Sequence, residues 1–166
     1  MKEYSVISNS TPLIAFIKKN ELSIIKQLFN KLIIPKAVYD EIINVPKSLE
    51  NEREILESEI KKEWIIIRKI KNLKFAELNL GRGETEAINT CLEVNEPLLL
   101  IDEKKGRNIA KSLKIPVLGT LGILTLAKKR RLKEGKQLQE NLDDLIKGGF
   151  YLSSEVILSF LNNLKK

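Results

Sequence analysis

Residues 97–102 read Pro97-Leu98-Leu99-Leu100-Ile101-Asp102, an apolar run that ends on a carboxylate. A short apolar run of this kind predicts a buried β-strand. A buried strand has no structural reason to end on a charge, because an unpaired carboxylate there is costly or becomes protonated. Asp102 is therefore a candidate functional residue. The alternative is that Asp102 caps the following helix, a role that Glu103 could share.

Three other polar residues stand at similar boundaries. Asn9 follows the apolar residues Val6-Ile7-Ser8, Glu41 lies beside the apolar Ile42, and Glu84 follows a glycine-rich break. Oxygen ligands that converge from distant segments are typical of a site for a hard divalent cation. The alternative for Glu41 is an ordinary surface acid, and the alternative for Glu84 is a first-turn acid favoured by the helix dipole.

Helix periodicity separates the two acids of the segment 81–94. Glu84 is in line with the apolar residues of this predicted helix, whereas Glu86, Thr90 and Glu93 lie on the opposite side. We therefore expect Glu84 to point inward and the other three to face water.

The order of the predicted elements defines the fold class. With 166 residues, the chain is long enough for one domain, which we expect to span 1–166. Predicted strands alternate with helices, which indicates an α/β sandwich around a mostly parallel sheet. The predicted strands are 4–8, 32–34, 64–67, 97–101 and 115–118, and the predicted helices include 22–29, 46–62, 107–113, 136–147 and 154–164.

Composition excludes several classes of chemistry. The chain has no histidine and one cysteine, Cys91, which removes serine–histidine hydrolysis, histidine-relay RNA cleavage and thiolate zinc sites. No apolar run approaches the roughly 18 residues of a membrane span. The first residues, Met1-Lys2-Glu3-Tyr4-Ser5, do not resemble a signal peptide, so we expect a cytoplasmic protein without membrane contact.

Charge favours an anionic partner. The chain has 29 Lys and Arg against 22 Asp and Glu, a net charge of +7, which suits nucleic acid or simply a well-solvated surface. The basic run 128–133 could follow a nucleic-acid backbone or could complement the end of a helix. Arg82 and Arg107, beside the candidate acids, could hold phosphate oxygens or offset the repulsion between the acids.

These motifs resemble, in their order, those of PIN-domain proteins. They are the stretch from Val6 to Ile14, Ile34-Pro35-x-x-Val38-x-x-Glu41, Gly81-x-Gly83-Glu84-x-x-Ala87-Ile88, Leu99-Leu100-Ile101-Asp102 and Val117-x-Gly119-Thr120-x-Gly122. The resemblance covers essentially the whole chain. It is closest to an uncharacterised prokaryotic branch of that superfamily.

The resemblance implies a three-layer α/β/α sandwich and an endoribonuclease dependent on Mg²⁺ or Mn²⁺. It places the metal ligands at Asn9, Glu41, Glu84 and Asp102, the last three also being catalytic. We expect Thr11, Glu103 and Thr120 beside these ligands. Many relatives are VapC-type toxins, so an RNA substrate, an antitoxin protein and a second copy of the chain are the implied partners.

Asn9 is a departure, because the family motif expects Asp at that position. An amide oxygen can still bind Mg²⁺, but one negative charge is lost. Two hypotheses follow: a metal-dependent ribonuclease that tolerates Asn9, or a catalytically degenerate PIN-like protein that binds RNA or another partner. A third, weaker hypothesis is a structural dimer in which the acids only cap helices.

Overall fold

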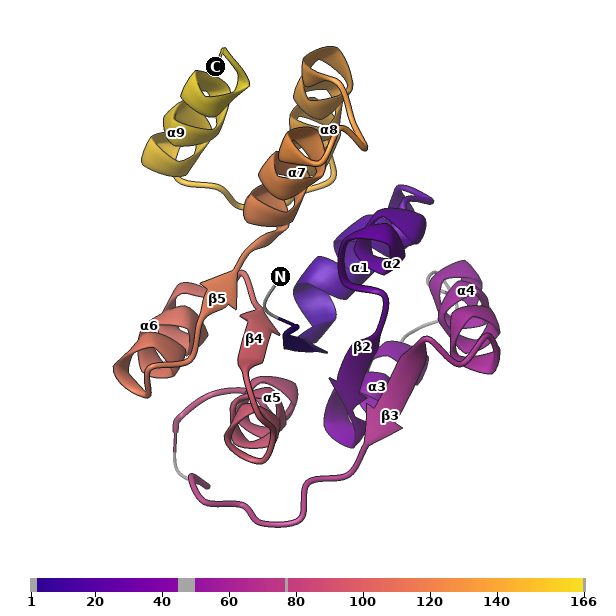
Figure 1. Ribbon diagram of the computed structural model, residues 1–166, viewed down its shortest axis with the longest axis vertical. Helices are drawn as coiled ribbons and strands as arrows, with labels where there is room; N and C mark the ends of the chain where they lie inside the picture. Colours follow the sequence, from indigo (N-terminus) through magenta and orange to yellow (C-terminus); the bar gives the residue numbers. More distant parts are fainter. Residues whose placement is uncertain (1–2, 45–49, 77, 166) are drawn as a thin grey trace. The chain divides into compact units, whose positions relative to one another are not determined.

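A computed structural model of the chain describes residues 3–44, 50–76 and 78–165. The chain divides into two compact units, residues 1–119 and 120–166, and each is described by itself (Figure 1). The first unit contains the sheet and most of the candidate residues.

The first unit is built on a parallel sheet. Among the described residues, five strands pair in the order β3-β2-β1-β4-β5, and every pairing is parallel. This confirms the predicted α/β fold class with a parallel central sheet. The strands are β1 (Ser5–Ser8), β2 (Leu32–Pro35), β3 (Ile65–Arg68), β4 (Pro97–Leu100) and β5 (Val117–Leu118).

Helices connect these strands, as parallel pairing requires. The predicted helix 22–29 is confirmed at both ends, whereas the predicted start of the helix 46–62 lies outside the described residues. The predicted helix 107–113 begins earlier than expected, at Lys104. The helices of this unit are α1 (Ser10–Lys18), α2 (Leu22–Phe29), α3 (Lys36–Ile43), α4 (Glu50–Lys61), α5 (Arg82–Leu92) and α6 (Lys104–Ser112).

Alternating side chains of the strands serve two hydrophobic layers. Ile7 and Leu99, which are register partners, pack with Ala87, Ile88 and Ala110 in the layer that α5 and α6 cover. The intervening strand residues point to the opposite face, because successive side chains of a strand alternate. There α2 contacts β2 and α4 contacts β3, so helices cover both faces of the sheet in a three-layer sandwich.

The second unit is helical. It consists of α7 (Thr120–Lys129), α8 (Gly135–Lys147) and α9 (Ser154–Leu164), which contact one another pairwise. Lys128 of α7 donates from Nζ to the carbonyl oxygens of Asn163 (3.3 Å) and Leu164 (2.7 Å) at the end of α9. One alternative for the basic run 128–133 was that it complements the end of a helix. Lys128 does so, but at the C-terminus of α9 rather than at the end of its own helix, α7.

No helix in the described part of the chain is long and apolar enough to cross a membrane.

Candidate functional site

The sheet reverses its direction of growth between two neighbouring strands. From β1 the chain extends one way through β2 and β3, and later returns to place β4 and β5 on the other side of β1. In open parallel sheets, ligands bind outside the carboxyl ends of the strands at such a switch point. The Asn9 backbone N–H donates to the Leu100 carbonyl (2.9 Å), so Asn9 lies beside the segment that leads to Asp102.

Asn9 is buried in an unusual way. It precedes the first residue of α1, yet its side chain makes no capping hydrogen bond. The residue is only 2% exposed, and its Oδ1 accepts no hydrogen bond from any described residue. A buried polar atom without a partner is costly, and most such atoms have a reason to exist. A ligand that binds Oδ1 would be such a reason.

Asp102 is half-buried, and the structure assigns the helix cap to its neighbour. The Glu103 carboxylate accepts the backbone N–H of Gly106 (2.6 Å) as the N-cap of α6. The N-cap of α6 is therefore Glu103, the residue that we considered as able to share this role with Asp102. This cap also explains the early start of α6, because it provides an acceptor for a first-turn N–H.

Arg107 lies close to Asp102. Its Nη1 donates to the Ile101 carbonyl (3.0 Å). A Cβ atom on Gly119 would come within 2.6 Å of Arg107 Nη1 and 3.0 Å of Asp102 Oδ1. Both side chains therefore lie against the bare backbone of Gly119, and Arg107 brings positive charge to the end of β4.

Glu84 is half-buried at the start of α5. Its Oε2 accepts the backbone N–H of Gly81 (3.1 Å), the residue before the first turn of α5. Burial raises the pKa of the Glu84 carboxyl, and the negative charges of Glu103 and Glu41 raise it further. A cation beside these acids would relieve that repulsion.

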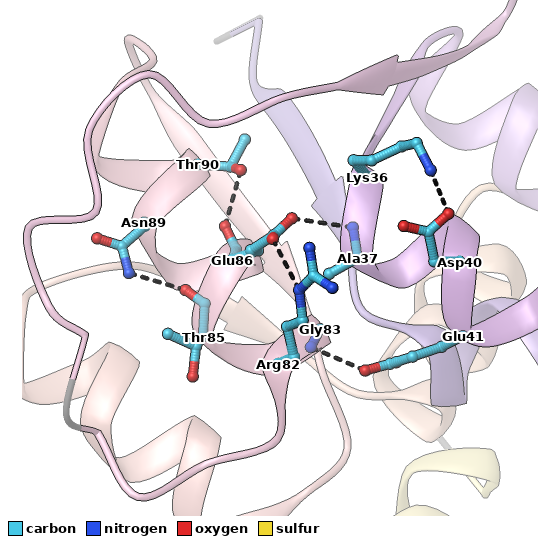
Figure 2. A network of polar contacts seen from close by, with 10 residues as sticks. All are labelled: Lys36, Ala37, Asp40, Glu41, Arg82, Gly83, Thr85, Glu86, Asn89 and Thr90. Carbon is cyan, nitrogen blue, oxygen red and sulfur yellow. Dashed lines mark hydrogen bonds and ion pairs between the residues drawn. The ribbon is translucent and has the colours of Figure 1, made fainter.

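Glu41 reaches from α3 to the start of α5, as Figure 2 shows. Its Oε1 accepts the backbone N–H of Gly83 (2.8 Å). Although Glu41 is exposed, it is not an isolated surface acid, because it is tied to the residue next to Glu84.

The prediction that Glu86, Thr90 and Glu93 face water is wrong. Glu86 is 9% exposed and accepts the Ala37 backbone N–H (2.9 Å), while Thr90 is buried and donates to the Glu86 carbonyl (2.8 Å). Glu93 accepts the backbone N–H groups of Lys71 and Asn72. These bonds lower the pKa of Glu93, as does Arg68. The sheet, α3 and residues 69–76 surround helix α5, so residues 85–91 of this helix are buried on every side.

The remaining predicted residues occupy varied positions. Thr11 is exposed at the start of α1, and Thr120 is buried at the start of α7, in the second unit. The Arg82 side chain is 74% exposed and pairs with Glu86 (3.4 Å). Sequence reasoning missed Gly83 and Glu86 as site residues; the second glycine of Gly81-x-Gly83 was the signal for a close approach.

The donor set suits a hard cation. Asn9, Glu41, Glu84 and Asp102 offer only oxygen, the preference of Mg²⁺ and Mn²⁺, and the Asn9 Oδ1 atom lacks a partner. Burial raises the pKa of the Cys91 thiol to about 12, so Cys91 is not a thiolate ligand. Within residues 3–44, 50–76 and 78–165, no three acidic or cysteine side chains come together as they stand to hold a metal ion.

The fold is that of an α/β protein with a parallel sheet, and the candidate residues Asn9 and Asp102 follow the two strands that meet at its switch point. The chain belongs to the PIN-domain superfamily: a family model described as DUF3368, PIN domain, matches residues 5–166. PIN domains are generally nucleases and typically use divalent metal ions. A comparison with curated proteins found no match.

The family match bears on the extent of the domain. It runs through both compact units, which divide after Gly119. A single domain over residues 1–166 stays a prediction, because two compact units can belong to one domain or to two.

Proposed function

We propose that this protein is a metal-dependent endoribonuclease that hydrolyses RNA phosphodiester bonds. Asn9, Glu41, Glu84 and Asp102 would hold Mg²⁺ or Mn²⁺. When bound, the ion would supply positive charge that stabilises the transition state at the phosphate and promotes ionisation of water. Family membership supports a nuclease, and the oxygen-only donor set supports the ion.

The buried Oδ1 of Asn9 is the observation that carries this proposal. This buried acceptor has no hydrogen bond among the described residues, and it lies at the switch point of the sheet. If Asn9 had only a structural role, its Oδ1 atom would be expected to accept a hydrogen bond from another group of the protein. A ligand role explains why the oxygen is kept bare.

The other residues would have distinct roles. Glu84 or Asp102 would orient the attacking water and accept its proton. Arg82, whose side chain is largely exposed, and Arg107, beside Asp102, would hold phosphate oxygens of the RNA. Thr11 and Glu103 would position the ligands.

The test is cleavage of a structured RNA by the purified protein in Mn²⁺ and in EDTA, with Asp102→Ala beside it. We expect cleavage in Mn²⁺ only, and none by the variant. Thermal unfolding in EDTA shows whether the variant is folded. Undiminished cleavage by folded Asp102→Ala would refute the site.

Asn9 also favours a second candidate function, a PIN-like protein that binds RNA or another partner without cutting it. The family acid is absent at this position, and the described acids form no ready group of three. Asn9→Asp separates the two candidates. If this variant cuts RNA and the natural protein does not, the natural protein is degenerate.

We infer an RNA substrate from the resemblance and from the net charge of +7, and an antitoxin protein and a second copy of the chain from the resemblance alone. A cytoplasmic location stays a prediction from the first residues of the sequence. Co-purification of the natural protein with the product of a neighbouring gene would test the antitoxin.

A further inference from the structure

Helices α3 and α5 cap each other. The first backbone N–H groups of an α-helix have no partner within the helix. The second residue of α3, Ala37, donates its N–H to Glu86 of α5 (2.9 Å), and the second residue of α5, Gly83, donates its N–H to Glu41 of α3 (2.8 Å). Figure 2 shows both bonds. Each helix therefore fixes the start of the other.

Gly83 leaves no space between these helices. A Cβ atom at this position would lie 2.4 Å from Glu41 Oε2 and 2.6 Å from Glu41 Oε1, distances that real Cβ atoms do not show. Gly83 is buried, and the Glu41 carboxylate lies flat against its backbone. Only glycine lets Glu41 approach the residue that precedes Glu84.

The Glu86 side of the pair is held independently. Its carboxylate accepts the Ala37 N–H and also pairs with Arg82 (3.4 Å), the first residue of α5. The Glu86–Ala37 bond and the Glu41–Gly83 bond lie at opposite ends of the contact between α3 and α5. Each bond by itself fixes the position of α3 along α5.

We propose that Gly83 and Glu86 are positioning residues that hold the Glu41 carboxylate beside Glu84, so that both can bind one divalent cation. This inference rests on the proposed function, since it assumes that the two acids are metal ligands. Neither Gly83 nor Glu86 would touch the ion. They would affect metal binding only indirectly, by fixing the position of the Glu41 carboxylate.

Gly83→Ala is the test. The new methyl group would meet the flexible end of the Glu41 side chain, which can swing aside, and alanine suits a helix, so the fold should persist. We expect the Kd for Mn²⁺, measured by calorimetry in the absence of RNA, to rise about 10–100-fold, as for other residues that orient metal ligands. Displacing Glu41 leaves the Gly83 N–H without its acceptor, a cost that the better helix propensity of alanine offsets in part. The variant should therefore remain folded in EDTA with a modestly lower melting temperature.

Gly135→Ala is the matched control. Gly135 is the first residue of α8, so, like Gly83 in α5, it lies in the first turn of its helix. A Cβ atom on Gly135 would meet only the Leu164 carbonyl, at 4.0 Å. Its Kd for Mn²⁺ should equal that of the natural protein.

A double-mutant cycle shows whether Gly83 acts through Glu41. In a Glu41→Ala background, adding Gly83→Ala should weaken Mn²⁺ binding less than twofold further, because the affected ligand is already lost. Natural affinity in Gly83→Ala, or a full additive loss in the Glu41→Ala background, would overturn the inference and leave the proposed function standing. Failure of the natural protein itself to bind Mn²⁺ would overturn both.

Discussion

At the scale of the residue, the candidate site combines two groups whose surroundings are unfavourable in the metal-free protein. Asn9 presents a buried oxygen without a hydrogen bond, and Glu84 is a half-buried carboxyl whose pKa is raised by burial and by neighbouring acids. Both conditions reduce the stability of the metal-free protein. A bound cation would relieve both conditions. A substitution at either position that strengthens metal binding should therefore lower the stability of the metal-free protein, and the reverse.

Asn9→Asp should show this opposition. A carboxylate at this buried position should destabilise the protein in EDTA at pH 7 by about 1–3 kcal/mol, because it is desolvated near other acids. In Mn²⁺ the same variant should gain a larger rise in melting temperature than the natural protein, because tighter binding stabilises the folded state. Asn51→Asp, at an exposed position of α4, is the control and should change neither value.

Glu84→Gln should make metal-free stability less dependent on pH. A carboxyl whose pKa is raised on folding binds more protons in the folded state, so its contribution falls as pH rises from the unfolded pKa through the folded pKa. The variant lacks this loss. It should melt at a higher temperature than the natural protein in EDTA at pH 7, with the difference disappearing at pH values below about 4. A lower melting temperature at pH 7 would contradict the direction given for this pKa.

At the scale of the element, α5 organises the site. One side packs on the sheet through Ala87 and Ile88, and its start is bound to α3. On a further side Asn89 bonds both the N–H and the carbonyl of Phe75. Residues 69–76 therefore cover the polar residues of α5, and Glu84 is presented from a helix held in three directions.

Glu86→Ala should destabilise this arrangement. It leaves the buried Ala37 N–H without an acceptor, at a cost of about 1–3 kcal/mol. Thermal unfolding in EDTA should show a fall in melting temperature of roughly 2–4 °C for each kcal/mol lost. Glu86→Gln retains an acceptor and should lose less. Glu54→Ala, at an exposed position of α4, is the control, and an equal fall in it would argue against a specific cap.

At the scale of the whole molecule, sheet topology determines which residues form the candidate site, and net charge determines which kind of ligand it attracts. Strand order brings the end of β1 beside the end of β4, although Ser8 and Leu100 are 92 positions apart in the chain. The net charge of +7 adds a general attraction for polyanions.

RNA binding should therefore depend steeply on salt. In EDTA, where no cleavage is expected, the Kd for a single-stranded RNA should rise on the order of tenfold or more between 50 and 200 mM KCl, as counterions are released from several phosphates. Arg82→Gln should reduce the slope of log Kd against log salt by about 0.7 if it makes one phosphate contact. A Kd independent of salt would argue against a phosphate-based interface.

The sequence by itself determined the alternation of strands and helices, since local hydrophobic period decides these elements. It also placed Asn9 and Asp102 immediately after apolar strands, where parallel sheets collect function. Only the tertiary structure decided the surroundings of α5. Periodicity assumed that its polar face meets water, whereas α3 and residues 69–76 cover it, so Glu86, Thr90 and Glu93 are bonded within the protein. The contact of Glu41 with Gly83 likewise joins residues 42 positions apart, which no local pattern contains.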